Sequence, residues 1–289
     1  MAASGVGNTA IGAAVCRLIE QFEPPLFRLF DDPIVGSLLG SFVSLPLFFS
    51  AVRWYALKRM DKITPGLYGA QVCRTRTIDD AVEAALAQGI DQFAILGAGL
   101  DSRPYRLAGI ERVRVYELDL PEAQKRKKSR LKSALGRLPQ NVRFVPIDFE
   151  TESLDSVFAG TDFEPKRPTA VVWEGVTQYL REAAVAQTFQ FFAKAAPGSR
   201  IVFTYVRKSV IDGRSDIPGA TRLLDSVAEN GAPWLFGLEP SSLKQYLAPY
   251  GLELVADVGA ADYQDLYLRP VERSLTVSEI ERTATAVVR

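Results

Sequence analysis

Short apolar runs alternate with amphipathic segments over most of the chain beyond about residue 78. The first run ends in a glycine and the next three are followed by an acidic residue, as is typical of buried parallel strands. The runs predict strands at residues 92–97, 112–118, 142–147, 170–173 and 200–206. Helices are predicted beside them at residues 78–88, 121–135, 182–196, 220–229 and 241–250. The last of these helices has Ser241 as its expected N-cap and Gly251 as its stop.

Two segments near the C-terminus, residues 252–258 and 264–268, are predicted to form a final antiparallel pair. Strands that alternate with helices predict an α/β fold. We therefore expect a doubly wound, Rossmann-like, mostly parallel seven-stranded sheet with one antiparallel strand.

The first 90 residues are predicted to be helical, with helices at residues 12–29 and 33–57. Ile34 to Val52 contains no charged residue and approaches the length of a membrane span. Because this segment includes Pro46 and lies between polar segments, we interpret it as an apolar lid rather than a membrane-surface anchor. No internal linker or repeat divides the chain. We expect one domain over residues 1–289, with the lid in 1–90 and a core in 91–289 that carries an inserted helical lid around 211–240.

A glycine loop follows the first predicted strand. Residues 93–101 read Phe-Ala-Ile-Leu-Gly-Ala-Gly-Leu-Asp, and Asp119 ends the next apolar run. Gly97 and Gly99 allow a tight turn against a ligand, and a carboxylate at Asp119 can accept hydrogen bonds from ribose hydroxyls. This combination predicts a nucleoside cofactor.

The details of the loop favour S-adenosylmethionine over a nicotinamide dinucleotide. Ser102 stands where a dinucleotide fingerprint needs its third glycine. Asp101 places an anion where a pyrophosphate would otherwise lie, whereas S-adenosylmethionine has no phosphate and carries positive charge. Arg103 and Arg106 follow closely and weaken this argument.

Acidic residues also follow the third and fourth predicted strands. Asp148 and Phe149 end the third strand, and Glu174 ends the fourth. Ligands of open α/β sheets bind outside the carboxyl ends of the strands. We therefore expect these residues to converge with Asp119 on one crevice, with Phe149 beside an adenine. The alternative is that each acid is only a cap or turn residue.

Three blocks of sequence carry a resemblance to a known family: Leu-Gly-Ala-Gly-Leu-Asp-Ser-Arg, Tyr-Glu-Leu-Asp-Leu-Pro and Glu-Gly-Val-Thr-Gln-Tyr-Leu. From about Cys16 to Tyr267, the chain resembles the leucine carboxyl methyltransferase superfamily. That group includes phosphatase carboxyl methyltransferases and bacterial polyketide carboxyl O-methyltransferases. The resemblance implies a methyltransferase that uses S-adenosylmethionine, with a polyketide or other secondary metabolite as acceptor.

The resemblance also implies roles for individual residues. Arg74 would clamp the carboxylate of the cofactor, with Arg76 as the alternative. The other implied cofactor contacts are Gly97, Asp119, Asp148, Phe149 and Glu174. Some members add an N-terminal basic residue to the clamp, and neither Arg17 nor Arg28 aligns with it.

Composition narrows the function further. The net charge is zero, so no overall field attracts nucleic acid. The basic run Lys125–Arg130 is interpreted as a solvated helix face. Two cysteines without a metal-ligand spacing and the absence of histidine predict no disulfide framework and no metal site. The N-terminus lacks the features of a secretion signal, which predicts a cytoplasmic protein.

The absence of histidine favours a carboxylate as the methyl acceptor. A carboxylate is already ionised at neutral pH, whereas a hydroxyl needs a base such as histidine. Glu174 is the candidate base in the hydroxyl case, although cofactor contact is its favoured role. Residues expected to line the acceptor pocket are Tyr205, Arg207, Trp234 and Phe236.

The sequence thus predicts an S-adenosylmethionine-dependent O-methyltransferase that converts a small-molecule carboxylate into a methyl ester. A hydroxyl O-methyltransferase is the first alternative. A nicotinamide-dependent reductase and a non-catalytic cofactor-binding scaffold are alternatives from other classes.

Overall fold

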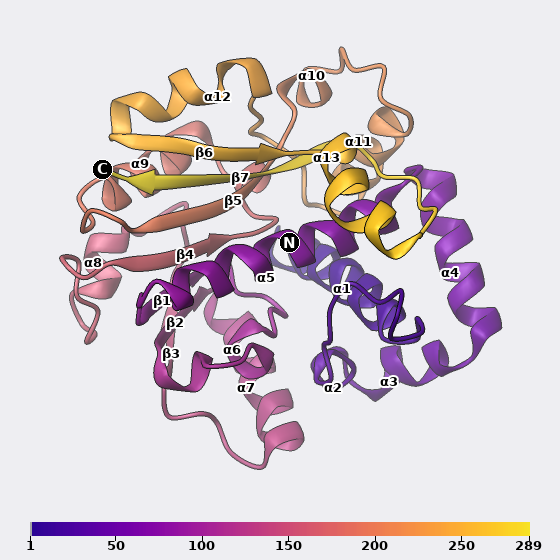
Figure 1. Cartoon of the computed structure of the whole chain (residues 1–289), viewed down its shortest axis with the longest axis horizontal. Coiled ribbons are helices and arrows are strands. Elements are labelled where there is room, and N and C mark those ends of the chain that lie inside the picture. The colour runs from indigo at the N-terminus through magenta and orange to yellow at the C-terminus, as the bar shows by residue number, and fades with distance from the viewer. Residues whose placement is uncertain (1) are drawn as a thin grey trace.

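The computed structural model describes residues 2–289, and side chains from residue 9 onward. A seven-stranded sheet forms its centre, in the order β3-β2-β1-β4-β5-β7-β6 (Figure 1). The strands are β1 (Gln92–Leu96), β2 (Arg114–Asp119), β3 (Val142–Pro146), β4 (Thr169–Trp173), β5 (Arg200–Val206), β6 (Leu252–Val258) and β7 (Glu281–Val288). Only β7, among these strands, runs antiparallel to its neighbours β5 and β6. The predicted fold class is confirmed.

The strand order reverses between β1 and β4. β1 pairs in parallel with β2 on one side and with β4 on the other. The chain leaves these strands in opposite lateral directions at this point, which opens a crevice at their carboxyl ends. The glycine loop, Asp119 and Glu174 follow or end these three strands, so the topology gathers them there.

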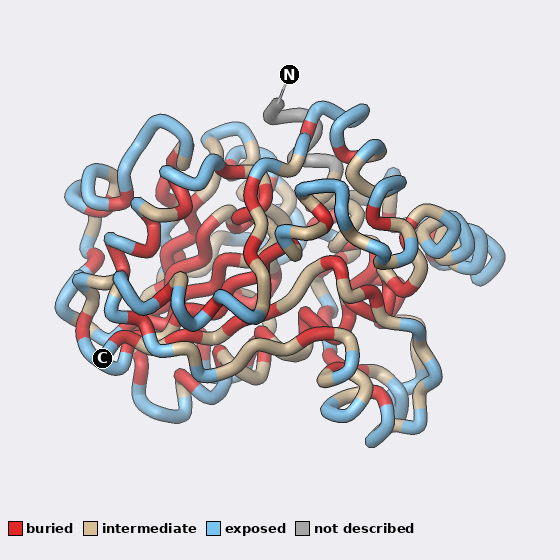
Figure 2. Tube along the Cα trace, turned by 90° about the horizontal axis from the view of Figure 1, so that it is seen from above, coloured by how far each residue is buried: buried red, intermediate tan, exposed pale blue. Residues whose placement is uncertain are grey.

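Helices cover both faces of the sheet. Alternate strand residues face opposite sides. Leu96, Tyr116 and Trp173 pack toward α8, α9 and α12, whereas Ile95 and Val115 pack toward α5. Figure 2 shows this buried core as the red interior of the molecule. The longer helices after the N-terminal region are α5 (Leu67–Ala87), α7 (Pro121–Leu135), α9 (Glu182–Phe192), α11 (Ala220–Glu229) and α12 (Pro240–Leu247). The shorter ones are α6 (Arg103–Arg106), α8 (Leu154–Phe158), α10 (Lys208–Ile211) and α13 (Ala260–Tyr263).

The predicted strand at residues 264–268 is wrong. Gln264–Leu268 continues α13 as a single π-helical segment. Tyr263 and Leu268 are both buried, and their spacing of five residues suits such a wide turn. The true partner of β6 is β7, whose sequence Glu-Arg-Thr-Ala-Thr-Ala-Val-Val is too polar to mark it as an apolar run. Its alternation shows only in the burial of Ala284, Ala286 and Val288.

The N-terminal helices also differ from the prediction. Instead of one helix over residues 33–57, the chain forms α2 (Val35–Leu39), α3 (Ser41–Ser44), the 3-10 turn η1 (Leu45–Phe48) and α4 (Ser50–Ile63). Gly40, with φ of 79°, ends α2, and Pro46 lies in the first turn of η1. Helix α1 spans Ala2–Glu20 and ends well before Leu29.

Two helix starts were also predicted incorrectly. α5 begins at Leu67 rather than Ile78, directly after Gly66 in the left-handed conformation. α12 begins at Pro240, and its N-cap Glu239 makes no side-chain capping bond. Ser241 therefore lies inside the first turn and is not the cap.

The apolar segment from Ile34 to Val52 lies along α1 and α7. Its helix α2 contacts both of these helices, and Arg130 donates a hydrogen bond to the Leu38 carbonyl oxygen. Within residues 2–289, no helix is long and apolar enough to cross a membrane. The role of this segment as a lid stays a prediction.

The basic run on α7 is only partly the solvated face that the sequence predicted. Lys125 and Arg126 are exposed, but Lys127 is buried. Its Nζ donates to Glu117 Oε1 at 2.8 Å and to the Ala98 carbonyl oxygen at 3.2 Å. Lys127 thereby ties α7 to both β2 and the glycine loop.

Replacing Lys127 should be far more costly than replacing its exposed neighbour. Lys127→Met leaves the Glu117 carboxylate buried without its partner, and breaking a buried pair costs about 3 to 5 kcal/mol. Lys125→Met should change stability by less than about 0.5 kcal/mol. Urea unfolding of both variants measures the contrast. Equal free energies of unfolding for the two variants would show that Lys127 does not stabilise the buried charge of Glu117.

Candidate functional site

The glycine loop turns tightly after β1. Gly97 has φ of 67°, and a Cβ there would lie 2.4 Å from Val176 Cγ2. Any other residue would be strained both by its backbone and by this contact. The chain therefore passes close to the segment after β4, which brings the loop beside Glu174.

Asp119 fixes the loop from the end of β2. Its carboxylate accepts hydrogen bonds from the N–H groups of Gly99 and Leu120. Burial raises the pKa of Asp119, and the two hydrogen bonds oppose this effect. A carboxylate has about four acceptor positions, so Asp119 can still bind further hydroxyl donors.

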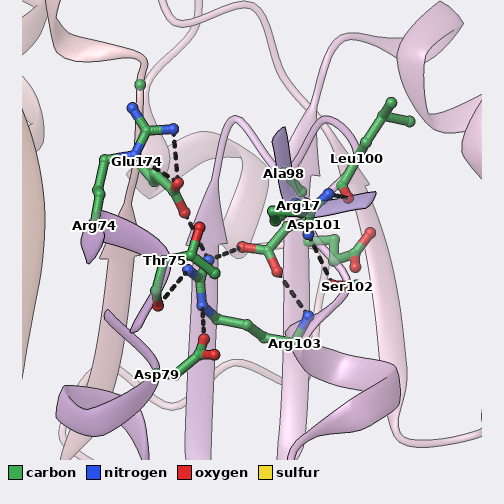
Figure 3. Close-up of polar contacts among 12 residues, drawn as sticks. Arg17, Arg74, Thr75, Asp79, Ala98, Leu100, Asp101, Ser102, Arg103 and Glu174 are labelled. Carbon is green, nitrogen blue, oxygen red and sulfur yellow. Dashed lines mark hydrogen bonds and ion pairs between the residues drawn. The ribbon is translucent and has the colours of Figure 1, made fainter. Parts of the chain in front are cut away.

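Glu174 lies between two guanidinium groups (Figure 3). Arg74 of α5 donates from Nε to Glu174 Oε1 at 2.8 Å. Arg103 of α6 donates from Nη1 to Oε2 at 2.7 Å. Both arginines are buried, with side chains 8% and 2% exposed, so little water screens these contacts.

These contacts decide the ionisation of Glu174. Burial alone would raise its pKa, but the charges of Arg103 and Arg74 outweigh burial and lower the pKa to about 2. A carboxyl whose pKa is lower in the folded state stabilises the fold above its unfolded pKa of about 4.3. That contribution is lost as the pH falls toward 2. At neutral pH, Glu174 is a permanent anion.

Arg103 connects the glycine loop to α5. Its Nε donates to Asp79 Oδ1 and its Nη1 to Asp101 Oδ2, both at 2.7 Å. Arg106 donates to the same Asp79 oxygen at 2.7 Å. In the sequence, Arg103 stands out only as a charge next to the glycine loop. Its place in the Gly-Leu-Asp-Ser-Arg block was the signal that could have identified it.

Arg17 approaches the glycine loop from α1, although the sequence did not align it. Its Nη2 donates to the Leu100 carbonyl oxygen at 2.6 Å. Its Nη1 donates to Ser102 Oγ at 2.8 Å and to Asp32 Oδ2 at 3.0 Å. Arg28 instead pairs with the exposed Asp31. Arg17 thus connects the N-terminal region to the glycine loop through Leu100 and Ser102.

Glu281 is a member of the cluster that the sequence analysis missed. It begins β7 opposite Val206 and accepts a hydrogen bond from Arg74 Nη1 through Oε2. Its Oε1 is buried and has no hydrogen-bond partner among residues 2–289. Because β7 was not recognised as a strand, nothing in the sequence placed Glu281 here.

Arg76, the alternative clamp residue, lies elsewhere on α5. It pairs with Asp80 one turn along the helix and donates to the Leu29 carbonyl oxygen. Its side chain is 43% exposed, against 8% for Arg74. Of the two, only Arg74 meets Glu174.

Asp148 and Phe149 lie just beyond β3, as the sequence predicted. Asp148 Oδ1 accepts a hydrogen bond from the Glu150 N–H at 3.0 Å, which forms a local turn. Phe149 is half-buried and packs against the core cluster. This geometry agrees with the alternative that Asp148 is a turn residue. An adenine contact by Asp148 and Phe149 stays a prediction.

The expected acceptor residues lie on different sides of the sheet. Tyr205 is fully buried and donates to Asp257 on β6, on the face opposite Val206. It is therefore not brought to the Arg74 cluster. Arg207 directly follows β5, and its buried Nε has no hydrogen-bond partner in the described structure. Trp234 packs beside Val206 on the inserted segment.

Phe236, two residues beyond Trp234, is buried in the core cluster. Its aromatic ring lies near that of Tyr246. We therefore do not assign it to an acceptor pocket.

Comparison with known proteins decides the family. The model of the leucine carboxyl methyltransferase family matches residues 10–193. The chain belongs to this family.

Relatives support the same assignment. A Mycobacterium tuberculosis protein, named provisionally as an S-adenosyl-L-methionine-dependent methyltransferase, is 35% identical over 213 residues, covering 72% of this chain and 69% of its own length. A Frankia alni protein with the same description is 31% identical over 264 residues, covering 87% and 90%. The fold is similar to that of a provisionally named methyltransferase from Thermobifida fusca, with a TM-score of 0.60 and 18% identity over 93% of this chain and 99% of the other.

The leucine carboxyl methyltransferase family member described here is an S-adenosylmethionine-dependent methyltransferase. The residues at the crevice fit this cofactor. The unpartnered Glu281 Oε1 and the ionised Glu174 offer acceptors to a cationic ligand. Arg74 offers a planar donor for its carboxylate. Asp119, at the end of β2, keeps acceptor positions beyond its bonds to Gly99 and Leu120.

We predict that the shape of the Arg74 side chain matters, as well as its charge. Arg74→Lys keeps a cation between Glu174 and Glu281 but loses the planar, bidentate donor. Affinity for S-adenosylhomocysteine should fall about tenfold or more, since hydrogen bonds to charged groups contribute about 1.5 to 3 kcal/mol. Calorimetric titration measures this change.

Arg76→Lys, on the same helix, is the matched control and should bind like the wild type. The reverse pattern, with weak binding only in Arg76→Lys, would move the clamp to Arg76.

Proposed function

We propose that this methyltransferase transfers a methyl group to the carboxylate of a small molecule and forms a methyl ester. The observation that carries the proposal is the position of Glu174 between Arg74 and Arg103. Glu174, the candidate base of the site, is thereby held as an anion that binds positive charge and is a poor acceptor of a proton. The family's description as leucine carboxyl methyltransferases supports the same acceptor chemistry.

The chain's own residues would bind each part of the cofactor. When bound, S-adenosylmethionine supplies an electrophilic methyl group on a positively charged sulfur. Arg74 would exchange its contacts with the two glutamates for the cofactor carboxylate. Glu174 and Glu281 would then accept hydrogen bonds from the ammonium group, and Asp119 would accept those of the ribose.

The ionisation of Glu174 argues against a hydroxyl acceptor. A general base works best when its pKa lies near the working pH. A carboxylate with a pKa of about 2 holds a proton too weakly to remove one from an alcohol or phenol. The chain contains no histidine to do so instead. A carboxylate acceptor needs only placement at attack distance.

Arg207 and Trp234 are the residues we propose for the acceptor. Arg207 extends from the end of β5, one residue beyond the position opposite Glu281. Its closest acidic neighbour is Glu239, at 3.7 Å, which is too long for a hydrogen bond. A guanidinium with an unused donor can bind an acceptor carboxylate, and Trp234 can cover its apolar part.

The pH dependence of turnover tests the acceptor class. Because neither the acceptor nor Glu174 changes its charge between about pH 6 and 9, the rate of the chemical step should stay flat over this range. The labelled product should release its methyl group as methanol on mild alkaline hydrolysis. A rate that rises with pH, together with a product that resists alkali, would establish a hydroxyl acceptor and refute the proposal.

Arg207→Ala tests the acceptor site separately from the cofactor site. The loss of an ion pair to the acceptor should raise the acceptor KM by about tenfold or more. Binding of S-adenosylhomocysteine should stay unchanged. Arg214→Ala, in the inserted segment that follows Arg207 along the chain and 72% exposed, is the control. Equal acceptor KM values in both variants would remove Arg207 from the acceptor site.

A further inference from the structure

Large apolar side chains are exposed together on the N-terminal region. Between residues 42 and 55, the most exposed are Phe42 at 95%, Phe49 at 70%, Trp54 at 63%, Phe48 at 62% and Tyr55 at 61%. Leu45, between them in the sequence, is 60% exposed. Single exposed apolar residues are ordinary, but a contiguous group of this kind marks an interaction surface. We name Phe42, Leu45, Phe48 and Phe49 the apolar tip.

Helix α4 continues from this tip along the edge of the molecule (Figure 1). None of its 14 residues, all of which the structure describes, is buried. Its inner side is half-buried, with Leu57 and Met60 packed against the N-terminal core cluster. Its outer side carries Trp54 and Tyr55, followed by three exposed basic residues: Lys58, Arg59 and Lys62.

The kind of side chain on the outer side of α4 changes along the helix. Trp54, Lys58 and Lys62 are spaced four residues apart, so they form one stripe. At 1.5 Å per residue, the stripe is about 12 Å long. Along the chain, the apolar tip comes first, the pair Trp54 and Tyr55 follows, and the basic residues of α4 come last. The layers of a bilayer follow the same order, from acyl chains through the interface that aromatic side chains favour to the lipid phosphates.

The apolar tip is held in place by the protein. Arg53 Nη1 donates to the carbonyl oxygens of Leu47 at 2.8 Å and Phe48 at 2.9 Å. The same guanidinium lies 4.1 Å from the centre of the Phe22 ring, which packs edge-on against Phe48. The exposed rings are thus presented on a fixed turn, so little ordering entropy would be lost when they bind.

The charge next to the tip selects the partner. Three basic side chains and the single acid Asp61 give the outer side of α4 a net charge of +2, from 3 − 1. The Asp61 carboxylate is also engaged by the Gly66 N–H. A second copy of the chain in a two-fold dimer would bring two such positive faces together, which is unfavourable. An anionic surface is complementary to them.

We propose that the apolar tip and α4 dock this protein onto the surface of an anionic lipid bilayer. Phe42, Leu45, Phe48 and Phe49 enter the boundary of the acyl chains, and Trp54 and Tyr55 lie at the interface. Lys58, Arg59 and Lys62 contact lipid phosphates. The protein lies on the membrane and does not cross it. The proposal thus assigns the exposed part of residues 34–52 to a membrane-surface anchor, in place of the lid that the sequence favoured. This inference is independent of the acceptor that the enzyme methylates.

Co-flotation of the full chain with vesicles tests the proposal. The wild type should bind phosphatidylcholine vesicles that contain phosphatidylserine, more weakly at high salt, and should bind pure phosphatidylcholine little. Each basic residue near such a surface contributes a factor of about five. Lys58→Glu with Lys62→Glu should therefore lower the partition coefficient at least about 25-fold. The matched control is Lys125→Glu with Lys132→Glu, exposed positions on α7.

The apolar part has its own variant pair. Phe48→Ser with Phe49→Ser should reduce binding to anionic vesicles by more than about tenfold. Val255→Ser with Leu266→Ser replaces residues of similar exposure elsewhere, 57% and 54%, and should bind like the wild type. Absence of vesicle binding by the wild type would overturn the proposal. So would a dimer in sedimentation velocity that Phe48→Ser with Phe49→Ser converts to a monomer, because a second copy would then cover the tip.

Discussion

The structure of the site depends on one buried anion, Glu174, held between two guanidinium groups. A carboxylate in a region of low dielectric constant is stable only when it is paired and hydrogen-bonded. Arg74 and Arg103 meet both requirements, and each belongs to a different element, α5 and α6. The pair thereby connects the helix layer to the glycine loop. It also keeps Glu174 ionised at every physiological pH.

The sheet topology explains why these charges meet. The order reverses between β1 and β4, so the glycine loop and Glu174 leave neighbouring strands at the same edge. β7, inserted between β5 and β6, brings Glu281 to this edge from the end of the chain. Arg74 then faces two carboxylates, which is a surplus of acceptors around one donor. Such a surplus fits a ligand that carries both a carboxylate and positive charge.

Much of this fold could be predicted from the sequence, because β1 to β5 are short, mostly apolar runs and the parallel pattern brings the acids at their ends to one edge. β7 could not be predicted, since its threonines and alanines are buried only through pairing with β5. Glu281 was missed for the same reason. The burial of Lys127 could not be predicted, because a run of basic residues does not show which of its side chains faces the core. The contact of Tyr205 with Asp257 could not be predicted, because nothing in the sequence shows which face of β5 each residue occupies.

A crystal structure with S-adenosylhomocysteine bound would test the central claim most directly. We expect the ligand carboxylate to lie about 3 Å from the Arg74 guanidinium, with the ligand amine donating to Glu174 or Glu281. The contacts between Arg103 and both Glu174 and Asp101 should remain in place. A complex in which Arg74 keeps both glutamates, while another cation such as Arg17 binds the ligand carboxylate, would contradict the account.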